Sequence, residues 1–236
     1  SLFTGMVQAL KKSPRVLKKD VTPPALPPAA KLPEVTAVVL LPGSIILQCS
    51  AKGALTAIHS KTQKVVSTAE VPGFISCASV ASSGAAWVGV GRSIYTVTFD
   101  GESTLSVALV GTENVHDQKV MMICPSDYRG QMWSATSAGQ IIVWDGAEVR
   151  CRRAIADTTI HTLCDVEIAG RPMMVVGCDD SIQLWESITC SLSSTLAIPA
   201  RGEVTSIVEV SPDVIWTAAR HKGKSSLYAW DFAHIY

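Results

Sequence analysis

The residues of this sequence that could perform acid–base, nucleophilic or metal chemistry are few and widely spaced. The five histidines stand at positions 59, 116, 161, 221 and 234, and no two have ligand spacing within one element. G-x-S-x-G, G-x-G-x-x-G, H-E-x-x-H and P-loop motifs do not occur. Asp179 and Asp180 are adjacent, which in a strand would point them to opposite sides, and the pair is typical of a tight turn. A triad could still assemble from distant loops, yet the sequence predicts no enzyme, no metal site and no cofactor.

Seven cysteines are spread along the chain. Their number is odd, none belongs to a C-x-x-C pair, and several lie in apolar runs such as residues 121–124. Such cysteines behave as small core hydrophobes, so we expect buried, reduced thiols and an intracellular, reducing compartment. A disulfide framework and a zinc site are the alternatives.

The charges of the sequence are balanced, with twenty basic and twenty acidic residues and a formal net charge of zero. Such a surface gives no long-range attraction to nucleic acid or anionic lipid, so we expect neither as a generic partner. No apolar run approaches the roughly 20 residues that span a bilayer, and no signal peptide is recognisable. Because the chain starts without Met, we expect it to be a segment of a longer protein.

Residues 1–33 differ in composition from the rest of the chain. They contain six of the twelve prolines and five basic residues between Lys11 and Lys19. The run Pro-Pro-Ala-Leu-Pro-Pro disfavours both helix and central strand and predicts polyproline II. We interpret residues 1–33 as a basic, proline-rich tether or latch strand; Pro24–Pro27 also matches a P-x-x-P ligand.

From residue 34 onward, short aliphatic runs broken by Gly, Asp, Ser and Pro indicate an all-β sandwich, barrel or propeller. Self-similarity favours the propeller, because five equivalent first-strand positions recur at the length of one four-stranded blade. These positions are Val35, Ile75, Val120, Ile160 and Val204. We therefore predict a propeller of four-stranded antiparallel blades over residues 34–236. The five units are expected at about 34–73, 74–117, 118–157, 158–201 and 202–236.

Tryptophan recurs at two positions of these units. In the second strands the residues are Trp87, Trp133 and Trp216. In the third strands they are Trp144, Trp185 and Trp230, each followed by Asp or Glu. Recurrence at fixed positions favours packing between blades over a role as exposed binding anchors.

The Trp-Asp and Trp-Glu pairs resemble those of the WD-repeat family, and the likeness covers about residues 34–236. Blades of that family often add a His before the first strand, a Ser or Thr in the second strand and an Asp in the next turn, hydrogen-bonded toward the Trp. The third unit has His116, Ser134 or Thr136, and Trp144, but Ala138 stands where the Asp would be.

The other units depart further from that pattern. The fourth has Asp179 and Trp185, while His161 lies inside its first strand and does not match. The first and second units lack the third-strand Trp. The resemblance implies structural roles for His116, Trp144, Asp179, Trp185 and Trp230.

The fifth unit ends after its third strand, so one outer strand is missing from it. Two interpretations stay open. In one, the stretch from Arg15 to Val21 supplies the strand and closes a five-bladed ring. In the other, which we favour because the resemblance is to a seven-bladed family, the chain is part of a larger propeller.

A propeller with no catalytic motif indicates a non-catalytic scaffold that binds other proteins or peptides, as part of a larger signalling, trafficking or assembly protein. The resemblance implies a binding surface around the central channel. Projected onto this chain, it contains Lys52, Arg92, Asp117, Asp180, Arg201, His221 and Lys222. Their basic excess would suit an acidic or phosphorylated segment, or a phosphoinositide headgroup. A third interpretation is a regulatory propeller of an enzyme whose catalytic domain lies outside the chain.

Overall fold

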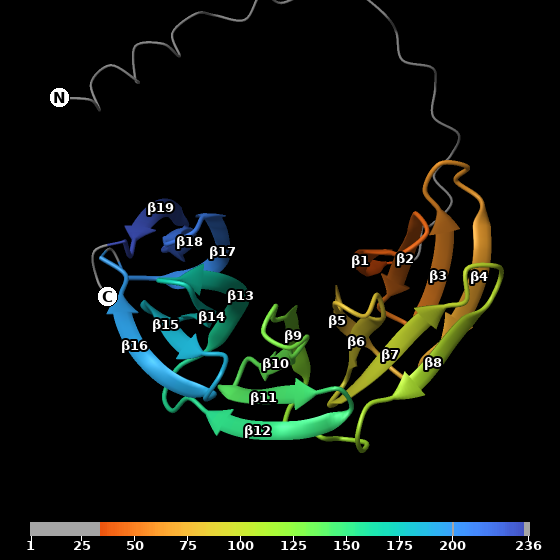
Figure 1. The fold of residues 1–236 in the computed structure, drawn as a ribbon, viewed down its shortest axis with the longest axis horizontal. Helices are drawn as coiled ribbons and strands as arrows, with labels where there is room; N and C mark the ends of the chain where they lie inside the picture. Colours follow the sequence, from red (N-terminus) through yellow and green to blue (C-terminus); the bar gives the residue numbers. More distant parts are fainter. Residues whose placement is uncertain (1–33, 200, 234–236) are drawn as a thin grey trace, which may run out of the picture. The chain divides into compact units, whose positions relative to one another are not determined.

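A computed structural model describes residues 34–199 and 201–233, all within one compact unit. These residues form nineteen β-strands and no helix, arranged in five antiparallel sheets (Figure 1). The first sheet contains β1 (Val35–Leu41), β2 (Ile45–Ser50), β3 (Ala54–His59) and β4 (Val65–Glu70). The second contains β5 (Ile75–Val80), β6 (Ala86–Val90), β7 (Ser93–Phe99) and β8 (Leu105–Leu109).

The remaining three sheets follow in chain order. The third contains β9 (Val120–Pro125), β10 (Met132–Thr136), β11 (Gln140–Asp145) and β12 (Glu148–Ala154). The fourth contains β13 (Ile160–Ile168), β14 (Arg171–Cys178), β15 (Ser181–Glu186) and β16 (Ser191–Ala197). The fifth contains β17 (Glu203–Ser211), β18 (Val214–His221) and β19 (Lys224–Asp231).

Each sheet is a meander in which sequential strands pair with their neighbours. The predicted all-β propeller of five repeat units is therefore confirmed, including the three-stranded fifth blade. Residues 1–33, with the predicted tether and the latch strand from Arg15 to Val21, lie outside the described residues.

The strands differ in burial according to their place in the blade. The second strands β6 and β10 are buried at every residue, because sheets of adjacent blades cover both of their faces. The fourth strands alternate or are largely exposed, as in β4 and β12. An apolar run without alternation therefore marks the middle of a blade, and a polar, alternating run marks its rim.

Adjacent blades pack through their first strands, in the succession β1–β5–β9–β13–β17. Figure 1 shows these strands on the inner side of an arc and the fourth strands on its outer side. Near this inner side the sheets approach closely. A side chain on Gly177 of β14 would collide with Thr162 and with Val204 of the next blade. Glycine at this position permits the close approach of β14 and β17.

The faces at the two ends of the arc expose apolar side chains that inner blades bury. Leu227 is 64% exposed, although Ile141 and Ile182, which hold the same register position, are fully buried. On the first blade, Val38 is 59% exposed, whereas its equivalent Ile207 packs against the fourth blade. The first and last sheets lie apart in Figure 1. The end faces thus correspond to the two sides by which the inner blades pack against their neighbours.

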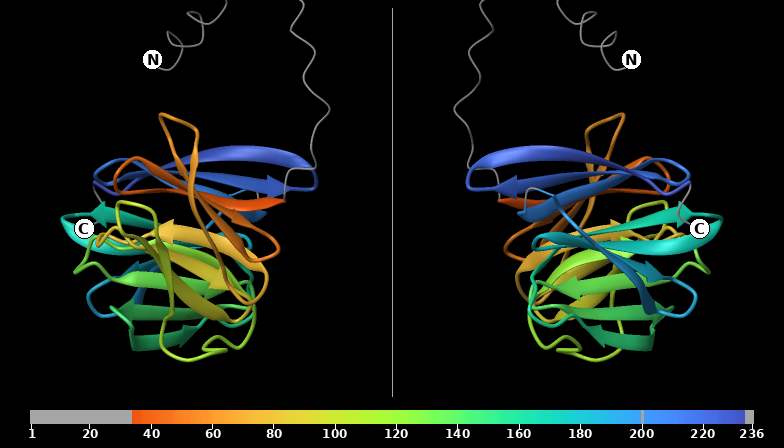
Figure 2. Two further views of the ribbon diagram at one scale, coloured as in Figure 1. Left: turned by 90° about the vertical axis from the view of Figure 1, so that its right-hand side faces the viewer. Right: turned by 90° about the vertical axis from the view of Figure 1, so that its left-hand side faces the viewer.

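The side views show where the connections lie. In Figure 2 most strands run across the thickness of the arc, so that turns gather at its two faces. We call upper face the one that holds the β2–β3, β6–β7, β10–β11, β14–β15 and β18–β19 turns and the loops leading into β5, β9, β13 and β17. The lower face holds the turns β1–β2, β5–β6, β9–β10, β13–β14 and β17–β18.

The packing between blades predicts different losses of stability for Trp133 and Trp216, which hold the same register position in different blades. Trp133→Ala removes a fully buried ring between the third and fourth blades and should lower the free energy of unfolding by about 3–5 kcal/mol. Trp216→Ala removes a ring that is 42% exposed and should cost about 1 kcal/mol or less. Urea unfolding followed by circular dichroism measures both, and equal losses would contradict the packing described.

Candidate functional site

The turns and loops of the upper face are bound to each other by a repeated backbone hydrogen bond. In three blades the residue that follows the fourth strand donates its N–H to a carbonyl of the β2–β3-type turn. The pairs are Val71 to Gly53 at 2.9 Å, Ile155 to Gly139 at 2.9 Å and Ile198 to Asp180 at 2.8 Å. The rigid sheets therefore fix both the turn and the loop that could contact a partner.

Two of these turns require glycine. Gly53 and Gly139 have φ angles of 88° and 91°, and a Cβ on either would collide with the carbonyl oxygen of Val71 or Ile155. In the fourth blade Asp180 adopts a φ of 58°, which Asp tolerates better than most residues. Its carboxylate accepts a hydrogen bond from the N–H of Gly202 in the loop that leads into β17.

The seven residues predicted to bind a partner lie in these turns and loops, and all are exposed. Arg92 donates from Nε to the carbonyl of His116 at 2.9 Å, which brings it beside Asp117. Asp180 is held to Gly202, next to Arg201. Of this set, Lys52 is the one residue in the first blade, His221 ends β18, and Lys222 lies in the turn that follows it. The structure thus assembles two small groups from the predicted set, and their binding role stays a prediction.

An aromatic residue that the sequence reasoning missed also lies on the upper face. Phe74 is 45% exposed and precedes β5, and Lys119 holds the equivalent place before β9. The Lys119 Nζ lies 3.7 Å from the centre of the Phe74 ring, a cation–π contact. Their shared position before a first strand was the signal that could have identified the pair.

Below the upper face, His116 is the centre of a buried polar network in the third blade. Its Nδ1 is 2.8 Å from Gln140 Oε1, and its Nε2 is 2.8 Å from Ser134 Oγ. The indole Nε1 of Trp144 donates to the same Ser134 oxygen at 2.7 Å. The implied structural set therefore forms in this blade with Ser134, not Thr136. Ala138 occupies the position expected for Asp, and Gln140, two residues further on, bonds the histidine instead; its Oε1 also accepts the N–H of Asp117.

The protonation of His116 follows from these partners. Burial lowers the pKa of His116 to about 4, although the hydrogen bond to Gln140 acts in the opposite direction. The ring is therefore neutral at pH 7. Since Gln140 Oε1 can only accept, Nδ1 carries the proton and Nε2 accepts from the Ser134 hydroxyl.

The other third-strand tryptophans satisfy their indole N–H in different ways. Trp230 donates to Thr217 Oγ1 at 2.9 Å, and Thr217 holds the register position of Ser134. Trp185 donates to Gln183 in its own strand at 3.0 Å, because Val176 replaces the hydroxyl residue there. Only the third blade, among the described residues, combines His, Ser and Trp in one network.

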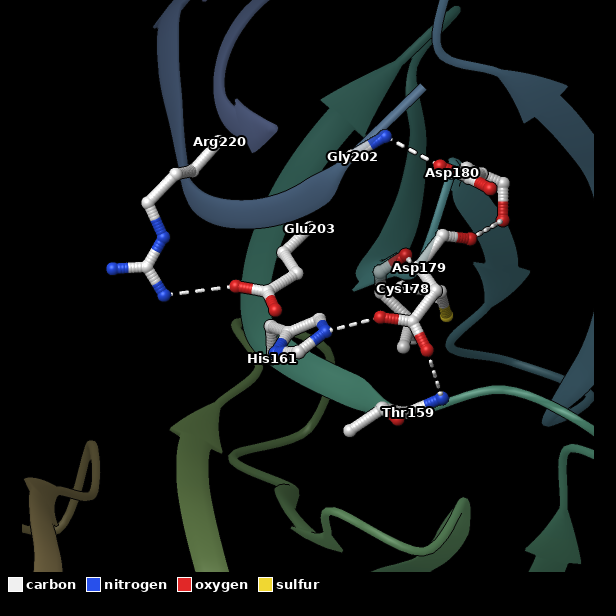
Figure 3. Close-up of polar contacts among 10 residues, drawn as sticks. Thr159, His161, Cys178, Asp179, Asp180, Gly202, Glu203 and Arg220 are labelled. Atoms are coloured by element: carbon white, nitrogen blue, oxygen red, sulfur yellow. Dashed lines mark hydrogen bonds and ion pairs between the residues drawn. The ribbon is translucent and has the colours of Figure 1, made fainter. Parts of the chain in front are cut away.

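Asp179 and His161 form a contact that the sequence comparison with the WD pattern did not predict (Figure 3). His161 Nε2 lies 2.6 Å from Asp179 Oδ1, and the N–H of Thr159 donates to Asp179 Oδ2 at 3.0 Å. Burial acts to raise the pKa of Asp179, but the hydrogen bonds from His161 and Thr159 lower it below its usual value. Asp179 thus links the end of β14 to the start of β13.

The same corner is connected to the fifth blade. Asp179 forms an antiparallel backbone bridge with Glu203, and the Glu203 carboxylate accepts from Arg220 at 2.9 Å. Figure 3 shows His161, Asp179 and Glu203 side by side. The contacts join β13, β14, β17 and β18 and fix the loop that carries Arg201.

The His161–Asp179 pair has the form of a general base with its orienting carboxylate. The adjacent Cys178 does not fit the role of a nucleophile beside this pair. Burial raises the pKa of its thiol to about 11 and keeps it protonated at neutral pH. The prediction that the chain is not an enzyme stays a prediction.

All seven cysteines are free thiols, three of them buried and four half-buried. Burial raises the pKa of Cys49 and of Cys124 to about 12. They act as the core hydrophobes that the sequence indicated, and the described residues contain no group of three or more His, Cys, Asp or Glu arranged to hold a metal ion.

Comparison with known proteins identifies the architecture. No protein-family model matches the chain, and no curated protein sequence matches it. A solved structure, the β-propeller domain of Myceliophteria thermophila Cps50 (Swd1), superimposes with a TM-score of 0.62 at 12% identity, over 85% of this chain and 71% of that one. The chain is a β-propeller, and at this identity the likeness shows the fold alone.

The described part of the chain consists of strands with their turns and loops. None of its segments forms a helix of the length and hydropathy that crossing a bilayer requires.

The His116 network predicts a pH dependence of stability. The folded-state pKa of about 4 lies below the ordinary value of 6.5, so the unfolded chain takes up the proton first on acidification. The free energy of unfolding should therefore fall by about 2 kcal/mol between pH 7 and pH 5 through this residue. Urea unfolding of the wild type and of His116→Gln at both pH values measures it. The free energy of unfolding of the variant should fall less from pH 7 to pH 5 than that of the wild type. Equal falls in the two proteins would contradict a neutral, buried His116.

Proposed function

We propose that this propeller is a non-catalytic platform that binds other proteins through its upper face. The single observation that carries the proposal is the exposed Phe74 ring with the Lys119 ammonium over it. Both are anchored directly before inner strands of adjacent blades. Aromatic side chains dominate the binding energy of protein interfaces, and charged residues form their rim.

The surroundings of this pair support a protein partner over a small molecule. Met121, one residue into β9, is 40% exposed, and Met is enriched at interfaces. The charged groups of Arg92, Asp117 and Lys52 lie in the turns and loops of the same face. Rigid scaffolding with adaptable apolar and charged side chains suits the recognition of a peptide or a folded domain.

Two finer assignments belong to this proposal. The His116–Ser134–Trp144 network supports kinship with WD-repeat propellers. The seven free thiols support a reducing, intracellular environment, where such a platform would serve a larger signalling, trafficking or assembly protein.

The test is affinity capture from cell extract with the whole chain as bait. Proteins bound by the wild type should be reduced at least about tenfold in Phe74→Ala, since interface aromatics contribute about 2 kcal/mol or more. Quantitative mass spectrometry measures the loss. Leu192→Ala, an exposed apolar change on the outer strand β16, should bind as the wild type does. Equal capture by all three proteins would refute the proposal.

A second candidate is the recognition of an acidic or phosphorylated ligand, a peptide or a phosphoinositide. The observation that favours it is the exposure of five basic residues in the turns and loops of the upper face. These are Lys52, Arg92, Lys119, Arg201 and Lys222, and they lie among the exposed acids Glu113, Asp117, Asp157, Asp179 and Asp180. Each phosphate contact is a charge-assisted hydrogen bond.

Charge reversal tests this candidate. Arg92→Glu with Lys222→Glu should weaken binding to phosphopeptides or to phosphoinositide liposomes by about tenfold or more, because attraction becomes repulsion. Microscale thermophoresis and liposome sedimentation measure it. If the wild type binds neither ligand but still captures proteins through Phe74, this candidate is excluded and the protein-binding proposal is retained.

A further inference from the structure

The lower face contains a groove between three blades that the proposed function does not use. Its volume is about 590 Å³, and it is formed by the β9–β10 turn, β13, the start of β14 and the end of β17. Its apolar part consists of Tyr128, Val166, Pro172, Val210 and Pro212. Four carboxylates surround that apolar part: Asp127, Asp165, Glu167 and Glu209. No basic residue lines the groove.

Two of the carboxylates connect neighbouring blades. Asp165 Oδ2 accepts the N–H of Asp127 at 2.8 Å, and Glu209 Oε1 accepts the N–H of Glu167 at 3.1 Å. Asp165 and Glu209 hold the same register position. In the first three blades that position is Leu40, Val80 and Pro125. A blade therefore folds without an acid there, and the fold alone does not account for the pair.

The other two carboxylates have no role in holding the blades together. Asp127 and Glu167 also share one register position, seven residues after the start of the first strand. They bond the next blade through backbone atoms alone: both N–H groups donate to it, and the Glu167 carbonyl accepts the N–H of Asp213. Both side chains are exposed, and none of the four carboxylates forms an ion pair within the part of the chain that the structure describes.

The negative charge of the groove is not balanced from within. Burial raises the pKa of Asp165 above its usual value, although hydrogen bonds from the Asp127 N–H and the Ser126 hydroxyl lower it, and the charges of Asp127 and Glu209 add to the rise. The Oδ1 of Asp165 is buried without a hydrogen-bond partner among the described residues, and such an atom favours an added donor. The guanidinium groups of Arg129 and Arg150 lie 5.3 and 5.9 Å from the Tyr128 ring centre, beside the groove and not in it.

We propose that this lower-face groove is a second docking surface, for an arginine-bearing segment of a partner protein whose apolar residues alternate with the arginines. The geometry fits such a segment in two ways. Carboxylates bind a guanidinium in bidentate fashion, and Val210 and the prolines give apolar contact between them. The acids come from three successive blades, at two positions that each recur in neighbouring blades, which suits an extended chain.

Fluorescence polarisation with the whole chain tests the proposal. The probe is a labelled peptide that alternates arginine with leucine, and the matched peptide has citrulline in place of arginine. The arginine peptide should bind, and the citrulline peptide should bind at least about tenfold more weakly, since citrulline keeps the shape and loses the charge. Equal binding of the two peptides would overturn the proposal.

Variants then locate the binding. Asp127→Asn with Glu167→Gln removes the two charges without a structural role and should weaken the arginine peptide about tenfold. Glu70→Gln with Glu148→Gln, on the outer strands β4 and β12, is the matched control and should leave the affinity unchanged. Circular dichroism checks that each variant is folded, and Val210→Ser tests the apolar contact.

Three outcomes would refute the groove as the site. The first is unchanged affinity in the Asp127→Asn/Glu167→Gln variant. The second is an equal loss in the control variant. The third is loss of the arginine peptide in Phe74→Ala, which would assign the peptide to the upper face. If the upper-face proposal alone is wrong, Phe74→Ala captures proteins as the wild type does and also binds the arginine peptide normally. The two proposals are therefore tested separately.

Discussion

The packing of one four-stranded sheet against the next is the interaction on which the rest of this structure depends. A single blade has two apolar faces, and it can bury them only between two neighbours. The second strands show the result, since β6 and β10 are buried at every residue. The exposed Leu227 and Val38 show the converse at the two ends of the arc. Stability therefore belongs to the stack and not to a blade.

The stack also positions every candidate functional group. Glycine at positions 53 and 139 lets the hairpin turns approach the next connection closely, and the hydrogen bond from Val71 or Ile155 then fixes both segments. On the lower face, carboxylates at one register position bond to the preceding blade. The blade junctions are thus where turns, loops and charges from different parts of the chain meet.

The chain provides hydrogen-bond acceptors for its third-strand tryptophans blade by blade. Blade three uses His116, Ser134 and Gln140 around Trp144, while blades four and five give their tryptophans one acceptor each. The first two blades have no third-strand Trp and hence no indole N–H to satisfy in that strand. Apolar packing is common to all five blades, and the polar network is a local addition to it.

The sequence by itself determined the class of fold and the repeat, because first-strand, turn and Trp positions recur at blade length and each reflects a local backbone requirement. It also indicated His116 and Trp144 as partners. It did not reveal that Gln140 would replace the expected Asp, that His161 would bind Asp179, or that Phe74 would meet Lys119. Those contacts join side chains from different strands or blades. Sequence spacing specifies neighbours along a strand, but the packing of blade on blade decides which residues meet across a junction.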